Sequence, residues 1–169
     1  MTATTLYLVT SGASTVDEPL GDLARLLSED GWRITVISTP MGTRFHDSES
    51  LHDATGGPVR VDFRMPGTGV RLEPADVVVA CPLSFNSTNK FANGIADNMA
   101  VATLCEMVGA DVPTVVVPKV SPPLCDHPAF ARSLAMLQAM PRVRVLWDRE
   151  TRIPAWHDVR HAARAIIDA

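Results

Sequence analysis

The sequence has few of the features that mark nucleic-acid-binding, membrane or secreted proteins. Fifteen lysine and arginine residues stand against 19 acidic ones, for a formal net charge of −4. The chain therefore lacks the basic excess that binding to a phosphate backbone requires. No apolar run approaches the ~20 residues of a membrane span, and the first ten residues, MTATTLYLVT, lack the cationic start of a secretory signal. We expect a cytoplasmic protein with neither nucleic acid nor a membrane as partner.

Cysteine is also scarce. Cys81, Cys105 and Cys125 are widely and irregularly spaced, which fits neither a disulfide framework nor a CxxC metal site. The first two lie in apolar stretches and are interpreted as small buried side chains, whereas Cys125 is the candidate for exposure. The HExxH motif of metal ligands is absent, so we expect no metal site.

What is present is the composition of an ordinary globular protein. Hydrophobic residues make up 46% of the chain and charged residues 20%, as is typical of a domain with a packed core. A length of 169 residues is within the range of one domain. We therefore expect a single domain over residues 1–169.

Six short, β-branched segments predict strands. Each is bounded by Gly, Pro or Asp, and several are apolar throughout, as expected of parallel strands that are covered on both faces. The segments are residues 4–9, 33–38, 59–63, 76–81, 113–118 and 143–147.

Segments with helical spacing alternate with these strands. The spacing of apolar residues indicates helices at 20–27 and 130–137, and a last helix is expected at about 156–167. A short helix, a break near Gly94 and a longer helix capped at about Asp97 are expected between 86 and 109. This alternation predicts a Rossmann-like three-layer α/β/α sandwich with a mostly parallel six-stranded sheet, in which ligands bind beyond the carboxyl ends of the strands.

The first two loops that follow strands are small and rich in hydroxyls. Ser11 and Gly12 belong to the first, where small residues let backbone amides approach a ligand and a helix N-terminus favours phosphate. The loop lacks the GxGxxG and GxxxxGK[ST] patterns, so a tight strand-to-helix turn explains it equally well. The second loop adds the hydroxyls of Ser38, Thr39 and Thr43.

The segment at residues 82–98, PLSFNSTNKFANGIADN, differs from these loops. It places four asparagines, two serines, a threonine and a lysine directly after an apolar strand. Amides both donate and accept hydrogen bonds, which suits the edge of an isoalloxazine ring or a ribityl chain. A polar loop that only caps a helix is the alternative.

The same segment resembles the PASANT motif and its continuation in the homo-oligomeric flavin-containing cysteine decarboxylases. That family includes phosphopantothenoylcysteine decarboxylase and the lantibiotic peptide decarboxylases. The positions that match in register are Pro82, Ser84, Asn86, Asn89, Lys90, Ala92, Gly94, Ile95, Ala96, Asp97 and Asn98. The resemblance implies a Rossmann-like fold, bound FMN, and assembly into a homotrimer or dodecamer.

The resemblance also assigns roles to individual residues. In the family, the first two loops hold the FMN phosphate, and the PASANT region holds the ring and the ribityl chain. With the Ser38 hydroxyl of the second loop included, the implied cofactor-binding residues are Ser11, Gly12, Ser38, Thr39, Ser84, Asn86, Ser87, Asp97 and Asn98.

The chain departs from the family pattern at the catalytic histidine and in a second motif. The catalytic histidine, which the family carries fourteen residues before the PASANT proline, corresponds to Thr68. The family's PxMNxxMW motif corresponds to residues 118–125, where Ser121 replaces the asparagine that holds the substrate carboxylate and Cys125 replaces the tryptophan. Lys119 either pairs with an anionic substrate or is a solvated loop lysine. The candidate catalytic residues are therefore Asn86, Ser121 and Lys119.

Three functions remain open from the sequence. In the family, FMN accepts two electrons from a cysteinyl thiolate, the adjacent carboxylate leaves as carbon dioxide, and the protein supplies a base and orientation. The first hypothesis is an FMN-dependent decarboxylase-like lyase that acts on a small thiol acid or a cysteine-terminated peptide. The second is an FMN-binding carrier, sensor or partner subunit without decarboxylase activity, which the missing histidine favours. A flavin prenyltransferase is a weaker third, because the PASANT continuation fits the decarboxylases better.

Overall fold

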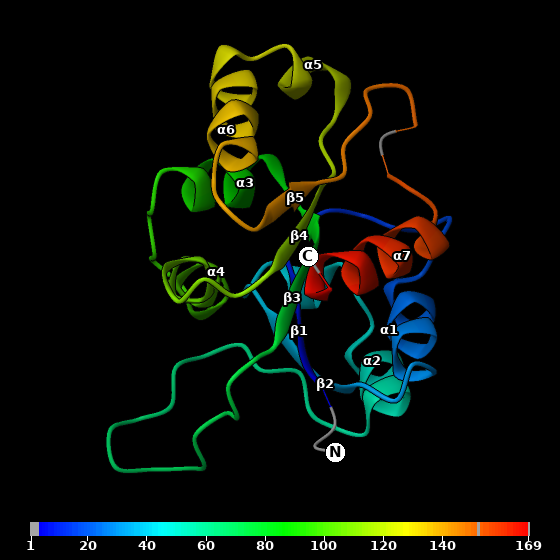
Figure 1. The fold of residues 1–169 in the computed structure, drawn as a ribbon, viewed down its shortest axis with the longest axis vertical. Helices are drawn as coiled ribbons and strands as arrows, with labels where there is room; N and C mark the ends of the chain where they lie inside the picture. Colours follow the sequence, from blue (N-terminus) through cyan, green and yellow to red (C-terminus); the bar gives the residue numbers. More distant parts are fainter. Residues whose placement is uncertain (1–3, 152, 169) are drawn as a thin grey trace.

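The computed structural model describes residues 4–151 and 153–168. In this part of the chain, five parallel strands form one sheet in the order β2-β1-β3-β4-β5 (Figure 1). The strands are β1 (Thr5–Thr10), β2 (Arg33–Ser38), β3 (Val77–Leu83), β4 (Thr114–Pro118) and β5 (Val143–Val145).

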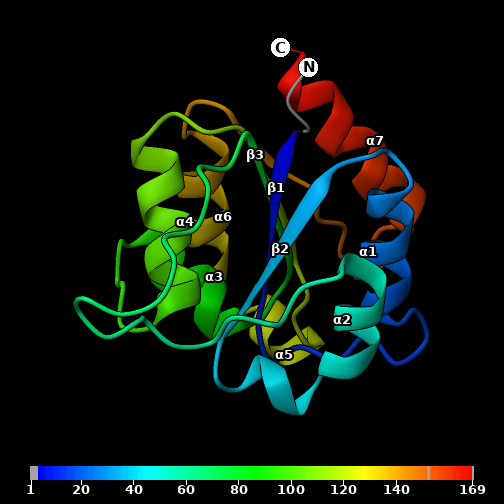
Figure 2. The same ribbon diagram turned by 90° about the horizontal axis from the view of Figure 1, so that it is seen from below.

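Helices cover both faces of this sheet, which confirms the predicted three-layer α/β/α architecture (Figure 2). One face carries α1 (Leu20–Ser28), α2 (Ser48–Thr55) and α7 (Trp156–Ile167). The other face carries α3 (Phe85–Ala92), α4 (Met99–Gly109) and α6 (Pro128–Gln138). The short helix α5 (Pro122–Cys125) follows β4, and the 3-10 turn η1 (Gly42–Arg44) follows β2. None of the helices described is long and apolar enough to cross a membrane.

The central strands are apolar throughout because their alternate side chains enter two separate cores. In β1, Leu6 and Leu8 pack in the core beneath α1 and α7, while Tyr7 and Val9 pack in the core beneath α3 and α4. The predicted helical spacing is confirmed as well. The residues that carried it are all buried, namely Leu20, Leu23 and Leu27 of α1 and Phe130, Leu134 and Leu137 of α6.

The prediction of a sixth strand at residues 59–63 is wrong. Arg60 alone forms an isolated bridge, with Ile37 at the edge of the sheet, and the chain then leaves the sheet, so that Phe63 is 61% exposed. A segment at this edge has a neighbour on one side only, and the charged side chains of Arg60 and Asp62 favour solvent over further pairing. The segment from Gly56 to Asp76 instead projects as a long loop (Figures 1 and 2).

Two helix or strand boundaries near the segment at residues 82–98 also differ from those predicted. Strand β3 continues through Pro82 to Leu83, beyond the predicted end at residue 81. The expected break is present at Gly94, which has φ 67°, but the cap of α4 is Asn98 and not Asp97. The Asn98 Oδ1 accepts a hydrogen bond from the Val101 amide at 3.1 Å, which satisfies one of the free amides at the start of that helix.

The strand order determines where a ligand can bind. The connection from β1 to β2 runs over the face that carries α1, and the connection from β3 to β4 runs over the face that carries α3 and α4. In parallel sheets of this order, connections that diverge in this way leave a crevice beyond the carboxyl ends of the two strands, β1 and β3. The loops after these strands are therefore the ones expected to meet a ligand.

Candidate functional site

A cavity of about 820 Å³ opens at this crevice. Its size lies in the range of small-molecule sites. Four loops that follow strands meet around it, together with the start of α4. The lining residues are Gly12, Ala13 and Ser14 after β1, Thr39, Pro40, Met41 and Phe45 after β2, Ser84, Phe85, Asn86 and Ser87 after β3, Asp97 and Asn98 before α4, and Lys119, Val120, Ser121 and Leu124 after β4.

The first turn of α3 forms the polar wall of the cavity. Ser84 is the N-cap of this helix, and its hydroxyl accepts a hydrogen bond from the Ser87 amide at 3.2 Å. The cap holds Ser84, Asn86 and Ser87 on one turn of helix, and all three line the cavity. Hydroxyls and an amide are thereby brought together directly after the buried strand β3.

The charges at the cavity are divided between an ion pair and a separate lysine. Lys90 of α3 pairs with Asp97, and its hydrogen bond lowers the pKa of that carboxyl. The side-chain amide of Asn98 also donates to the Asp97 carboxylate, at 3.0 Å. Among the described residues that line the cavity, Lys119 is the one cation. The cavity therefore offers a positive group at the β4 side that is suited to an anionic ligand.

The lining also includes large apolar side chains, which sequence reasoning did not assign to the site. Met41 and Phe45 of the loop after β2 are about half exposed, and Leu124 of α5 is 39% exposed. Phe85 also lines the cavity and packs edge-on against His127, with ring centroids 5.5 Å apart. Large apolar side chains in a loop that follows a strand are the signal that marks this part of the lining in the sequence.

The structure brings most of the predicted residues together, but not all of them. Seven of the nine implied cofactor-binding residues line the cavity, as do Asn86, Lys119 and Ser121, the candidate catalytic residues. Ser11 and Ser38 are 0% and 1% exposed and lie outside its lining. The Ser38 hydroxyl donates to the Thr39 carbonyl at 2.9 Å. Thr43 also lies outside the lining, and its hydroxyl donates to the Pro40 carbonyl.

Close packing between the first two loops explains one of the lining glycines. A Cβ atom at position 12 would lie 2.5 Å from the Met41 Cγ, which is closer than real Cβ contacts. Glycine at this position therefore lets the loop after β1 approach the loop after β2.

Neither Thr68, the position of the family's histidine, nor His46 is among the residues that line the cavity. Thr68 lies on the projecting loop between α2 and β3, where its hydroxyl donates to the Met65 carbonyl. His46 is 7% exposed, and its Nε2 lies 3.0 Å from the Ser11 carbonyl, to which it donates. Burial lowers the pKa of His46, so this ring is neutral at neutral pH.

The cysteines are free thiols. Burial raises the pKa of Cys81, which is fully buried, and of Cys105, which is half-buried. Cys125, expected to be exposed, is half-buried, and its sulfur lies 3.6 Å from the Val120 carbonyl. Cys125 is the last residue of α5, and it packs against the cluster formed by Val120, Phe130 and Leu134.

Comparison with known proteins adds a family and a set of related structures. A family model described as Flavoprotein matches residues 1–167. The coenzyme A biosynthesis bifunctional protein CoaBC of Bacillus subtilis is 36% identical over 121 residues, or 68% of this chain. The CoaBC protein of Thermococcus kodakarensis is 26% identical over 123 residues, or 70% of this chain. The chain spans about three tenths of the length of these curated relatives, 29% and 30% respectively.

Among solved structures, the fold is similar to that of TvaF, an FMN-dependent cysteine decarboxylase from thioviridamide biosynthesis. The TM-score is 0.77 at 25% sequence identity, and the match covers 98% of this chain and 99% of that one. The similarity therefore extends over the whole three-layer architecture, including the strand ends that carry the cavity.

Proposed function

Because this chain belongs to the flavoprotein family, we propose that it binds FMN in the cavity beyond the carboxyl ends of β1, β3 and β4. The observation that carries the proposal is the lining of this cavity, where the hydroxyls and amides of the PASANT-like segment meet the two loops expected to hold a phosphate. The similarity to TvaF, which is FMN-dependent, supports the choice of FMN.

The chemistry of the lining fits the parts of this cofactor. Gly12 and Thr39 come from the loops proposed for the phosphate, and Ser84, Asn86 and Ser87 supply donors and acceptors for the ribityl chain and the edge of the ring. Met41, Phe45 and Leu124 supply apolar surface of the kind that covers the flat face of a heterocycle. When bound, FMN supplies two-electron chemistry that no side chain of the protein provides.

For the activity, we propose an FMN-dependent decarboxylase-like lyase that acts on a cysteinyl or other thiol-bearing carboxylic acid, either a small thiol acid or a cysteine-terminated peptide. Lys119 and Ser121 line the cavity at the β4 side. The lysine would bind the substrate carboxylate through a charge-assisted hydrogen bond, and the serine hydroxyl would donate to it where the family uses an asparagine amide. Together they would orient the carboxylate.

A second function is favoured by the position of Thr68. General-base assistance contributes about 10²–10⁴ in rate, and in this chain the residue at the family's histidine position is a threonine on the projecting loop. A protein that keeps the flavin site without this base fits an FMN-binding carrier, sensor or partner subunit. Both functions share the same cofactor site and differ in turnover.

For the assembly, we propose a homotrimer or dodecamer. The support is the resemblance to a homo-oligomeric family and the half-exposed Met41 and Phe45 at the cavity, which are large apolar side chains left without a full covering. Light scattering on the purified protein distinguishes a trimer and a dodecamer from a monomer by mass.

Turnover separates the two functions. FMN-loaded protein incubated with cysteine-terminated peptides and with phosphopantothenoylcysteine should give a product lighter by carbon dioxide in mass spectrometry. Lys119→Met should reduce the rate by about tenfold or more, because a hydrogen bond to a charged group is lost, and should leave flavin binding unchanged. A protein that binds FMN but releases carbon dioxide from none of these substrates is a carrier, sensor or partner subunit and not a lyase.

A further inference from the structure

Ser11 lies at the junction of three of the loops that form the cavity. It follows β1 directly and is fully buried. Its amide and its hydroxyl both donate to the Pro82 carbonyl, at 3.1 and 3.0 Å. The hydroxyl also accepts a hydrogen bond from the Ser84 amide at 2.8 Å. The Ser11 carbonyl accepts from the Ala13 amide at 2.8 Å and from the His46 ring at 3.0 Å.

The direction of each of these hydrogen bonds is determined by its partner. A carbonyl oxygen only accepts and an amide N–H only donates, so both donors of Ser11 are used on Pro82. A phosphate oxygen accepts and needs a donor. Ser11 therefore has no donor left for a phosphate, and its hydroxyl is held between the Pro82 carbonyl and the Ser84 amide.

The partners of Ser11 belong to the polar wall and to the second loop. Ser84, whose amide donates to the Ser11 hydroxyl, is the N-cap of α3 and begins the turn that carries Asn86 and Ser87 into the cavity. His46 belongs to the segment after η1. One buried hydroxyl thus connects the loops after β1 and β3, and the carbonyl of the same residue connects both to the segment after β2.

The packing around Ser11 leaves little room for this junction to move. A Cβ atom at position 42 would lie 3.2 Å from the Ser11 Cα and 3.3 Å from its carbonyl carbon, so Gly42 packs directly against this backbone. Contact with the second loop therefore restrains the Ser11 backbone. The hydrogen bond between the Ser11 hydroxyl and the Ser84 amide in turn restrains Ser84.

We propose that Ser11 is a positioning residue, which holds the first turn of α3 in place to receive the flavin ring and ribityl chain and does not contact the cofactor phosphate. This inference rests on the proposed function, since it concerns the same cavity. It gives Ser11 a different role from the phosphate contact that the family resemblance implies.

Ser11→Ala, titrated with FMN and with riboflavin, tests the proposal, because riboflavin lacks the phosphate. If Ser11 positions α3, the variant loses affinity for both ligands by a similar factor of about ten, and the visible absorption spectrum of the flavin that remains bound changes. A residue that contacted the phosphate would weaken FMN binding and leave riboflavin binding unchanged. That result would overturn the proposal, and so would unchanged affinity for both ligands.

Thr114→Val is the matched control for the loss of a buried hydroxyl. The Thr114 hydroxyl is bonded to the Val112 carbonyl at 3.0 Å at the opposite end of the sheet, so this variant should keep the affinity for both flavins and the spectrum. An equal loss of affinity in Thr114→Val would show a global effect and refute the assignment. If Ser11→Ala does not fold, Ser11→Cys, with a weaker donor of similar size, carries the same comparison. Wild-type protein that binds neither flavin would refute the proposed function itself.

Discussion

The four asparagines of the PASANT-like segment, residues 82–98, make different contacts in the structure. Asn86 lines the cavity, whereas the Asn89 side chain accepts a hydrogen bond from the Ser133 hydroxyl at 2.6 Å and joins α3 to α6. Asn93 donates to the backbone of its own helix, and Asn98 caps the next helix. Within one motif, Asn86 and Asn98 line the cavity, whereas Asn89 and Asn93 make contacts behind it.

Neutral His46 should make the stability of the fold depend on pH. Burial holds the pKa of His46 below its ordinary value of 6.5, so the unfolded chain binds this proton more readily than the folded one. The His46 contribution is complete above about pH 6.5 and is lost as the pH falls through the lowered pKa. The melting temperature of wild-type protein should fall between pH 7.5 and 5.5.

His46→Gln tests the origin of this slope. The glutamine amide can still donate to the Ser11 carbonyl but does not titrate, so the variant should show a flatter dependence of the melting temperature on pH over the same range. The carboxyls whose pKa values are lowered, Asp30, Asp97 and Asp148, titrate below this range. Equal slopes in wild type and variant would contradict the account of His46.

Gly42 is the position where one added methyl group should separate the first two loops. A Cβ atom there would lie 2.3 Å from the Ser38 Oγ and close to the backbone of Ser11. We expect Gly42→Ala to lower the free energy of unfolding by about 1–3 kcal/mol, as overpacking of a buried contact does, and to weaken flavin binding. Denaturant unfolding and flavin titration measure the two effects.

The matched control for this substitution is Gly109→Ala at the end of α4, where an added Cβ would have no atom within 4 Å. This variant should bind flavin as the wild type does and should be no less stable, since alanine is the better helix residue. Gly42→Ala that behaved like Gly109→Ala would show that the two loops are not packed as described.

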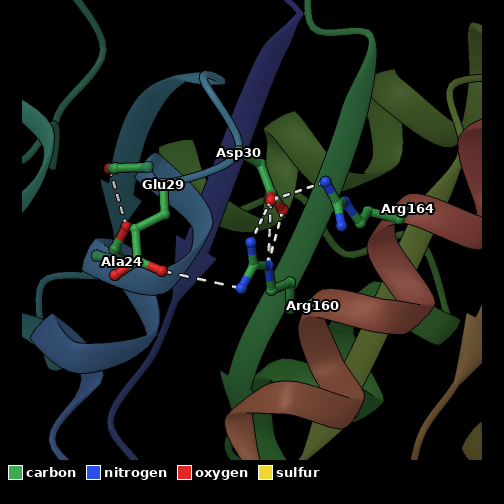
Figure 3. Close-up of polar contacts among 6 residues, drawn as sticks. Ala24, Glu29, Asp30, Arg160 and Arg164 are labelled. Atoms are coloured by element: carbon green, nitrogen blue, oxygen red, sulfur yellow. Dashed lines mark hydrogen bonds and ion pairs between the residues drawn. The ribbon is translucent and has the colours of Figure 1, made fainter.

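At the scale of helices and strands, the buried carboxylate of Asp30 forms ion pairs that hold α7 against the turn after α1. The Asp30 side chain, in the turn after α1, is 1% exposed and accepts from the Arg160 Nε at 3.0 Å and from Arg164 at 3.0 Å (Figure 3). Glu29 lies 3.8 Å from Arg160. The hydrogen bond from Arg160 lowers the pKa of Asp30. Two turns of α7 are thereby held against the turn between α1 and β2.

Asp30→Asn should therefore destabilise the fold. The amide cannot accept on both of its terminal atoms, and two guanidinium groups lose a charged partner, so we expect the free energy of unfolding to fall by about 1–3 kcal/mol. Asp126→Asn is the matched control, because the Asp126–Arg149 pair is 60% exposed on both sides and exposed pairs contribute little. Equal melting temperatures for the two variants would contradict the structural role of Asp30.

The elements that sequence reasoning predicted well are those whose signal is local. The spacing of Leu20, Leu23 and Leu27 is a property of one helix, and the structure buries all three. The failed strand at residues 59–63 depended on a partner far away in the chain, and only Arg60 found one. The Asp30–Arg160 contact joins residues 130 positions apart, and no periodicity in the sequence carries that information.

At the scale of the whole molecule, the parallel sheet is what assembles the site. Because the carboxyl ends of parallel strands meet at one edge, the loops expected to carry a ligand were predictable from the sequence, and they do line one cavity. Which residues within a loop face that cavity was not predictable. Ser11 and Ser38 have the same residue type as Ser84, but their side chains are buried and bond to backbone carbonyls, Ser11 to Pro82 and Ser38 to the adjacent Thr39.

Binding of FMN tests the central claim most directly. Purified protein stripped of bound cofactor and titrated with FMN, with flavin absorbance and fluorescence as the signals, should saturate at one FMN per chain. Asn86→Ala should bind more weakly, and Asn93→Ala, which loses only a bond within its own helix, should bind as the wild type does. Protein that is folded and gives no spectral change with FMN would contradict the account.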